Sequence, residues 1–447
     1  MVVVVLLVVV LVLALLAGVH WYVWRRLVRD TTREGGAARQ AGTVAIWVLP
    51  LLTVGALVSG RAGAPFRVER VLAWPGYLWL AVLLYLTLAL VVGEAVRPLL
   101  RRFLDRRTER TAGEAGAAGE EPAASPPAEA DADRRAPSAA APPRGGTDTD
   151  TVARADAKPD ANPDATPDAS PSGPSRRLFV SRVVGGAAAA AALGTVGYGT
   201  YGVLRGPRVK RVTVPLARLP RAAHGLRIAV VSDIHLGPIL GRAHTRRIVD
   251  TINSTQPDLV AIVGDLVDGT VADLGTAAEP LAQLESRHGS FFVTGNHEYF
   301  SGADEWVDHV RELGLRPLVN ERVEIQGFDL AGVNDIAGED EGQGPDFGQA
   351  LGDRDPARAS VLLAHQPVVI HDAVEHGVDL QLSGHTHGGQ LWPGNHLAEL
   401  ANPTVAGLER YGDTQLYVTR GAGTWGPPVR VGAPSDITVV QLASRQA

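Results

Sequence analysis

The sequence predicts an α/β domain in the C-terminal half of the chain, preceded by an all-α transmembrane region and a disordered linker. Three observations predict this. Uncharged runs of helical length fill the first hundred residues, a Pro/Ala/Asp-rich stretch follows, and short β-branched runs alternate with helical patterns from Leu226 onward. We expect four parts: an N-terminal membrane region at 1–104, a linker at 105–175, a short apolar segment at 176–204, and the α/β domain at 205–447.

The N-terminal region contains three uncharged runs that are long enough to cross a bilayer as helices, at residues 1–24, 41–59 and 71–92. Five arginines lie between the first two runs, three between the second and the third, and five more follow the third by residue 107. The positive-inside rule then places the two richer segments in the cytoplasm and the N-terminus outside.

The linker contains the repeat "PDANPDATPDASPSGPS" at residues 159–175 and almost no large apolar side chains. Such a stretch buries too little apolar surface to offset its chain entropy, so we expect it to be disordered and to act as a tether.

The segment 176–204 begins with an arginine pair and continues as a weakly apolar Ala/Gly/Val run. It has two interpretations: a fourth transmembrane helix, or a twin-arginine-type signal anchor, since "SRRLFV" resembles that export motif. Both interpretations place the residues after about 205 on the extracytoplasmic side of the membrane. The expected location is therefore the cell membrane, as a multi-pass protein whose C-terminal domain lies on the extracytoplasmic side.

Composition limits the chemistry of the chain. The formal net charge is −6, which does not fit a nucleic-acid binder, so no nucleic acid is expected as a partner. Cysteine is absent, which excludes disulfides, thiolate metal sites and cysteine nucleophiles. A metal site would have to be built from His, Asp, Glu or Asn.

The α/β domain is predicted from runs of strand length and from helical connections between them. Helical spacing of apolar residues appears at 243–254 and 304–314. The predicted strand runs are 226–233, 258–265, 290–298, 360–367, 378–387, 415–421 and 436–442.

Each of the first five runs carries Asp, Asn or His at or close to its end, and ligands of α/β sheets bind outside the carboxyl ends of strands. The candidate side chains are Asp233, His235, Asp265, Asn296, His297, His365, His385 and His387. A nitrogen and oxygen ligand set without sulfur suits Mn, Fe or Zn. The set is too large for one tetrahedral ion and about large enough for two divalent metal ions. The other histidines, among them His244, we expect at surface or helical positions.

The order of these motifs resembles a known family. "SDIH", "GD", "GNHE", "AHQP" and "GHTHGGQLWPG" follow one another as in the calcineurin-like metallophosphoesterases. The longer motifs look like the membrane-associated bacterial branch, which includes phosphodiesterases and UDP-diacylglucosamine pyrophosphatases. The resemblance covers about residues 225–442 and implies a β-sandwich of mixed sheets flanked by helices.

The resemblance also implies a role for each motif residue. The first metal would be held by Asp233, His235 and His387, the second by Asn296, His365 and His385, and Asp265 would bridge both. His297 resembles the family's catalytic histidine, which stabilises or protonates the leaving group. Either Asp268 or Glu298 could orient it.

The function expected from this resemblance is a membrane-anchored phosphoesterase in which two cations activate a shared hydroxide that attacks phosphorus. The substrate would be a phosphodiester or a pyrophosphate, with lipid-linked and nucleotide-like compounds both open. A non-catalytic membrane sensor or scaffold is the alternative. The sequence leaves the oligomeric state open.

Overall fold

The computed structural model describes residues 2–60, 62–117 and 176–445. Contacts divide the chain into two compact units, and the larger one consists of Met1–Ala95 together with Ser181–Ala447. The membrane helices up to residue 95 and the α/β domain therefore belong to the same unit. The smaller unit, Val96–Val180, contains the last part of α3 and the first turn of α4, where Arg176 and Asp105 form an exposed ion pair at 3.4 Å.

Four helices in the described residues are long and apolar enough to cross a membrane. They are α1 (Val2–Val23), continued by the π-helical turn η1 (Trp24–Arg29), α2 (Ala37–Val58), α3 (Phe66–Ala117) and α4 (Arg176–Leu204). The segment for which the sequence leaves a membrane helix and a signal anchor open is thus the single helix α4. Its role in export stays a prediction.

One boundary differs from the prediction. Residues 105–117, which we assigned to the linker, continue α3 as a helix. This part of the sequence, "DRRTERTAGEAGA", is rich in Arg, Glu and Ala, which are good helix formers, and it contains no proline. The rest of the predicted linker, residues 118–175, lies outside the described residues.

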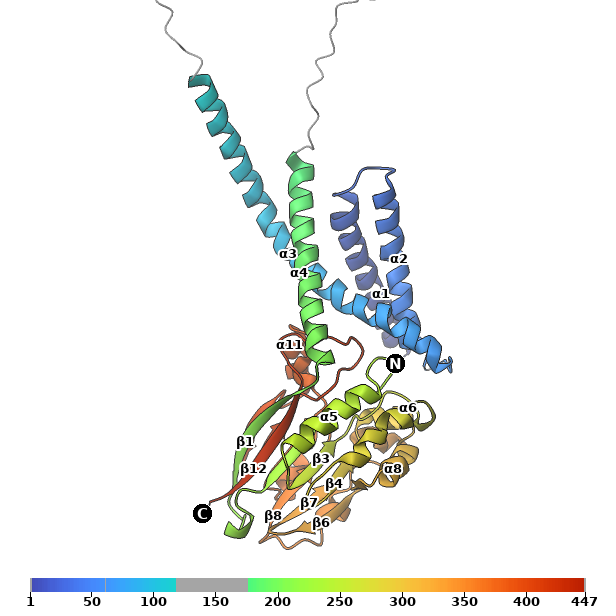
Figure 1. The fold of residues 1–447 in the computed structure, drawn as a ribbon, viewed down its shortest axis with the longest axis vertical. Coiled ribbons are helices and arrows are strands. Elements are labelled where there is room, and N and C mark those ends of the chain that lie inside the picture. Colours follow the sequence, from blue (N-terminus) through green and yellow to red (C-terminus); the bar gives the residue numbers. More distant parts are fainter. Residues whose placement is uncertain (1, 61, 118–175, 446–447) are drawn as a thin grey trace, which may run out of the picture. The chain divides into compact units, whose positions relative to one another are not determined.

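The α/β domain consists of two six-stranded mixed sheets. Figure 1 labels β1, β12, β3 and β4 of the first sheet and β6, β7 and β8 of the second. In the first sheet the strand order is β1 (Arg208–Leu216), β12 (Asp436–Ser444), β2 (Arg227–Val231), β3 (Leu259–Val263), β4 (Ser290–Val293) and β5 (Arg316–Pro317). In the second it is β10 (Gly407–Tyr411), β11 (Thr414–Val418), β9 (Leu380–Ser383), β8 (Ala359–Leu363), β7 (Phe328–Gly332) and β6 (Glu321–Ile325).

Parallel pairing aligns the strands that lead to the site. Strands β2, β3, β4 and β5 are mutually parallel, with Ile228 opposite Leu259, and so are β7, β8, β9 and β11, with Val361 opposite Leu380. Pairs β12–β2, β6–β7 and β10–β11 are antiparallel. The carboxyl ends of the parallel strands therefore meet at one edge of each sheet.

Apolar side chains of the two sheets meet face to face and form the central core, which includes Val230, Val263, Leu330, Leu363 and Leu382. The outer face of the first sheet is covered by α5 (Arg242–Ser254), α6 (Val271–Ala278) and α8 (Ala303–Glu312), which are drawn in front of β3 and β4 in Figure 1. The outer face of the second is covered by α9 (Phe347–Leu351) and α10 (Ile370–Glu375). The predicted class, mixed sheets flanked by helices, is confirmed.

Candidate metal centre

The candidate ligands lie on loops that follow five strands, at the carboxyl edges of both sheets. Asp233 and His235 follow β2, Asp265 follows β3, and Asn296 begins the short helix α7 (Asn296–Ser301) after β4. From the other sheet, His365 follows β8, and His385 with His387 follows β9. The two edges adjoin, because the backbone N–H of His385 donates to Asp233 Oδ1 at 3.0 Å.

The chain leaves these strands through left-handed backbone. Five of the seven candidate ligands have positive φ, between 48° and 71°: Asp233, His235, Asp265, His385 and His387. For residues other than glycine this conformation costs about 1–2 kcal/mol each, and it persists where the surrounding structure enforces it. The strands therefore end before the ligands, which explains why the observed strands are shorter than the predicted runs.

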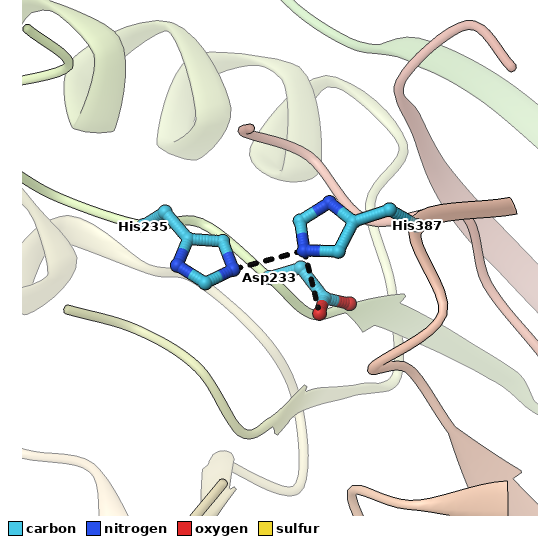
Figure 2. A group of neighbouring side chains, drawn as sticks. All are labelled: Asp233, His235 and His387. Atoms are coloured by element: carbon cyan, nitrogen blue, oxygen red, sulfur yellow. Dashed lines mark hydrogen bonds and ion pairs between the residues drawn. The ribbon is translucent and has the colours of Figure 1, made fainter. Parts of the chain in front are cut away.

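The first group consists of Asp233, His235 and His387, whose ligand atoms lie within 4.8 Å of one another (Figure 2). His387 Nε2 is 3.0 Å from His235 Nε2 and 3.4 Å from Asp233 Oδ1. Two imidazole nitrogens and a carboxylate oxygen thus point at one small volume, with all three side chains buried. Nitrogen and oxygen donors converging in this way are typical of a site for a divalent cation.

The second group consists of Asp265, His365 and His385, again with ligand atoms within 4.8 Å of one another. Asn296 joins it, because its Oδ1 lies 3.1 Å from His385 Nδ1. His365 Nε2 is buried and lies 3.1 Å from Asp265 Oδ2. A buried imidazole nitrogen and a carboxylate oxygen this close together could both bind one divalent cation.

Asp265 lies between the two groups. Its Oδ2 is 3.1 Å from His365 Nε2 in the second group and 3.7 Å from His235 Nε2 in the first. Its other oxygen, Oδ1, accepts the backbone N–H of His297 at 2.9 Å. This carboxylate is therefore in reach of both groups at once.

A third carboxylate, Asp268, links the first group to His297. Its Oδ1 lies 2.8 Å from His235 Nδ1 and 2.7 Å from His297 Nδ1. Of the two residues considered for orienting His297, Asp268 is the one in contact with its ring. Glu298 instead accepts three backbone N–H groups, from Gly295, Asp265 and Leu266, at 2.6–3.0 Å. It therefore holds the loops that carry Asp265 and Asn296.

Burial and charge adjust the acidities of this region. Burial works against ionisation of Asp265, but the neighbouring His365 and His235 outweigh it and hold the pKa of its carboxyl well below the usual range. Burial, together with nearby His365, lowers the pKa of His385 to about 4. Burial, His235 and Arg430 hold the pKa of His387 well below its ordinary value. An ionised carboxylate and neutral imidazoles are the forms that bind cations.

The other two imidazoles shift in the opposite direction. Burial lowers the pKa of His235, but the carboxylate of Asp268 outweighs this and raises it to about 9. Burial also lowers the pKa of His365, but the neighbouring carboxylate of Asp265 outweighs this effect. The pKa of His365 is therefore raised well above its ordinary value. In the metal-free protein, the protons on His235 and His365 balance the charge of the neighbouring carboxylates. A cation that binds these two rings would have to displace those protons.

Two residues near the site had no signal in the sequence motifs. Arg430 is buried and donates to the carbonyl of His387 and, at 3.0 Å, approaches its Nδ1. Trp425 lies with its ring 5.9 Å from that of His297. Both come from an irregular segment between β11 and β12. His244 is helical as expected but fully buried, and neither ring nitrogen has a hydrogen-bond partner among the described residues.

Comparison with known proteins gives consistent results. The sequence pattern of the family described as calcineurin-like phosphoesterase matches residues 226–389. A zebrafish (Danio rerio) protein named "transmembrane protein with metallophosphoesterase domain" is 40% identical over 259 residues, which cover 55% of this chain and 59% of the relative. The chain thus spans a little over half the length of that relative.

Two bacterial relatives are covered more fully. An uncharacterized metallophosphoesterase of Helicobacter pylori strain J99 is 39% identical over 255 residues, or 56% of this chain and 68% of the relative. One of Aquifex aeolicus is 35% identical over 243 residues, or 53% of this chain and 92% of the relative.

Proposed function

Because this chain belongs to the calcineurin-like phosphoesterase family, we propose that it is a membrane-anchored hydrolase that cleaves a phosphodiester or pyrophosphate bond with two divalent metal ions. One observation carries the proposal: the same carboxylate oxygen of Asp265 faces an imidazole of each ligand group. A carboxylate in reach of both groups could be shared by two adjacent cations.

The residues present fit such ions. One ion would be held by Asp233, His235 and His387, and the other by Asn296, His365 and His385, with Asp265 shared. The donors are nitrogen and oxygen only, which suits Mn, Fe or Zn. When bound, the two ions would lower the pKa of a water molecule and neutralise charge on the phosphate oxygens.

His297 is the proposed catalytic residue. Asp268 accepts the hydrogen at its Nδ1, so the other ring nitrogen, Nε2, is available to pass a proton to the leaving-group oxygen. The same carboxylate orients His235, so a single side chain positions a proposed ligand and the proposed proton donor.

We also propose that the α/β domain lies on the extracytoplasmic side of a cell membrane. This is supported by four helices of spanning length and by the arginine-rich segments after the first and third of them. Because the chain contains no cysteine, single cysteines can report the topology. A membrane-impermeant maleimide should label Arg410→Cys in intact cells and leave Arg33→Cys unlabelled, and the reverse pattern would contradict the proposed orientation.

The activity is tested with the metal-loaded full chain in detergent and bis-p-nitrophenyl phosphate as substrate. Asp265→Asn should remove turnover, because the shared ligand loses its charge, whereas Asp353→Asn, at an exposed carboxylate, should leave it unchanged. A folded, metal-loaded preparation that hydrolyses no mono-, di- or pyrophosphate ester would favour the alternative, a membrane sensor or scaffold that uses this fold for ligand binding.

A further inference from the structure

A cavity of about 250 Å³ lies beside the proposed catalytic histidine, and membrane helices supply part of its wall. His235, Asp268 and His297 line it from the α/β domain. Leu57 near the end of α2, with Phe66 and Tyr77 on α3, lines it from the N-terminal region. All of these residues belong to the same compact unit.

Separate contacts hold α3 against the α/β domain, so the wall does not depend on the cavity itself. Phe66 packs against the apolar cluster beneath α5, α6 and α8. Farther along α3, Tyr85 Oη donates to the carbonyl of Trp392 at 3.0 Å. Val429 and Val431, from the segment that also carries Arg430, pack into the apolar cluster of the membrane helices. These contacts fix the position of α3 relative to the proposed centre.

The paired helices α2 and α3 form a close-packed unit. A Cβ at Gly76 would lie 2.6 Å from the carbonyl oxygen of Leu52, so only glycine permits this approach. Thr53 Oγ1 donates to the carbonyl of Gly76 at 2.8 Å, and Tyr77 Oη donates to that of Ala56 at 3.2 Å. The wall near Leu57 is therefore held in place.

Two exposed aromatic side chains complete the lining of the cavity near His297. Phe300 and Trp425 also line the cavity, and their rings lie 5.6 Å and 5.9 Å from the ring of His297. They remain 69% and 56% exposed, which is unusual for two large apolar side chains beside a polar centre. Such exposed apolar surface is typical of a place where an apolar ligand binds.

We propose that the α2–α3 wall selects the substrate, and that the substrate is an amphiphilic phosphoester. Its phosphate would lie at the metal centre, and its apolar chain would pass between Leu57 and Phe66 on one side and Phe300 and Trp425 on the other. The helices that carry Leu57 and Phe66 are long and apolar enough to cross a membrane, so the chain of a membrane lipid can reach this wall directly. The inference rests on the proposed function for the location of the phosphate.

The test compares two substrates that differ only in chain length, methyl and dodecyl p-nitrophenyl phosphate, with the manganese-loaded full chain in detergent. Wild-type kcat/KM should favour the dodecyl ester. Leu57→Trp, which narrows the cavity near α2, and Phe66→Ala, which removes apolar contact, should each lower that preference about tenfold, because the dodecyl ester loses more contact with the wall than the methyl ester does. The controls Val58→Trp, at the neighbouring residue, and Phe103→Ala, at a 61% exposed phenylalanine of α3, line no part of the cavity and should keep the preference.

A binding measurement distinguishes failure of this inference from failure of the proposed function. If neither ester is hydrolysed, the proposed function fails, and dodecylphosphonate binding to the metal-loaded chain then tests the wall alone. Weaker binding by Leu57→Trp and Phe66→Ala than by their controls supports the inference. Folded variants that keep wild-type chain-length preference and wild-type dodecylphosphonate affinity would overturn it.

Discussion

Replacing Asp268 with asparagine should change how many protons the site releases when it binds metal. In the metal-free protein, burial lowers the pKa of His235, but Asp268 raises it to about 9, so the ring is protonated at pH 7. A ligand nitrogen must lose that proton before it can bind a cation. Asparagine keeps an oxygen that can accept the Nδ1 hydrogen but carries no charge to stabilise the proton.

The size of the effect follows from the pKa. At pH 7, removing a proton from a group with a pKa of about 9 costs about 2.7 kcal/mol, which lowers the apparent metal affinity about 100-fold. Wild-type affinity should therefore rise about tenfold per pH unit up to pH 9 on account of this ring alone. His365, whose pKa is also raised, should release a second proton. Asp268→Asn should also lower the affinity at pH 9 by about 10–100-fold, because His235 loses its orienting carboxylate.

The assay is calorimetric titration of the metal-free full chain with Mn²⁺ between pH 6.5 and 9, in buffers with different heats of ionisation. At pH 7 the wild type should release about two protons and Asp268→Asn about one. Asp308→Asn, at a 74% exposed carboxylate, is the matched control and should behave as the wild type. Equal proton release by Asp268→Asn and the wild type would refute the assignment of His235 as a ligand that Asp268 holds protonated.

Three further predictions concern residues around the site. His297→Asn should lower kcat by about 10²–10⁴-fold and leave the metal content, measured by elemental analysis, unchanged; a loss of metal would make His297 a ligand instead. Glu298→Gln should lower the free energy of unfolding by about 1–3 kcal/mol in urea titrations, because an amide cannot accept all three backbone hydrogens equally well; unchanged stability would contradict its role in holding the loops. Burial, with Arg247 and Arg430, lowers the pKa of His244 to about 3. Between pH 7.5 and 5 the unfolded chain therefore binds a proton at His244 that the folded chain does not bind, and the free energy of unfolding of the wild type should fall by about 2 kcal/mol. His244→Leu should remove that part of the loss, and an equally steep pH dependence in the variant would show that the folded protein accommodates the charged ring.

Much of the fold could be predicted because its parallel strands are short, β-branched and buried on both faces. The strands β2, β3, β4 and β9 all lie within predicted runs, and β8 begins one residue before its run. The hairpin of β6 and β7 was missed, because "ERVEIQGFDLAG" alternates charged and apolar residues only weakly and its pairing is decided by packing against the core. The edge strand β10 was missed for a similar reason, since it buries none of its five residues.

The proposed ligands could be chosen from the sequence because each follows a strand run and each belongs to a short motif. What could not be predicted is the tertiary context. Asp268 is only three residues from Asp265, yet its contact with His297 depends on how the loop after β3 meets α7. Arg430 lies about forty residues from His387 in a segment without regular structure, and no spacing rule connects the two. The contribution of Leu57 to the cavity required the packing of membrane helices on the α/β domain.

The most direct measurement is anomalous diffraction at the manganese absorption edge from crystals of the full chain grown with Mn²⁺. The proposal predicts two peaks, one among Asp233, His235 and His387 and one among Asn296, His365 and His385, with an Asp265 oxygen within bonding distance of each. A single peak, or two peaks of which Asp265 touches only one, would contradict the central claim of a shared carboxylate.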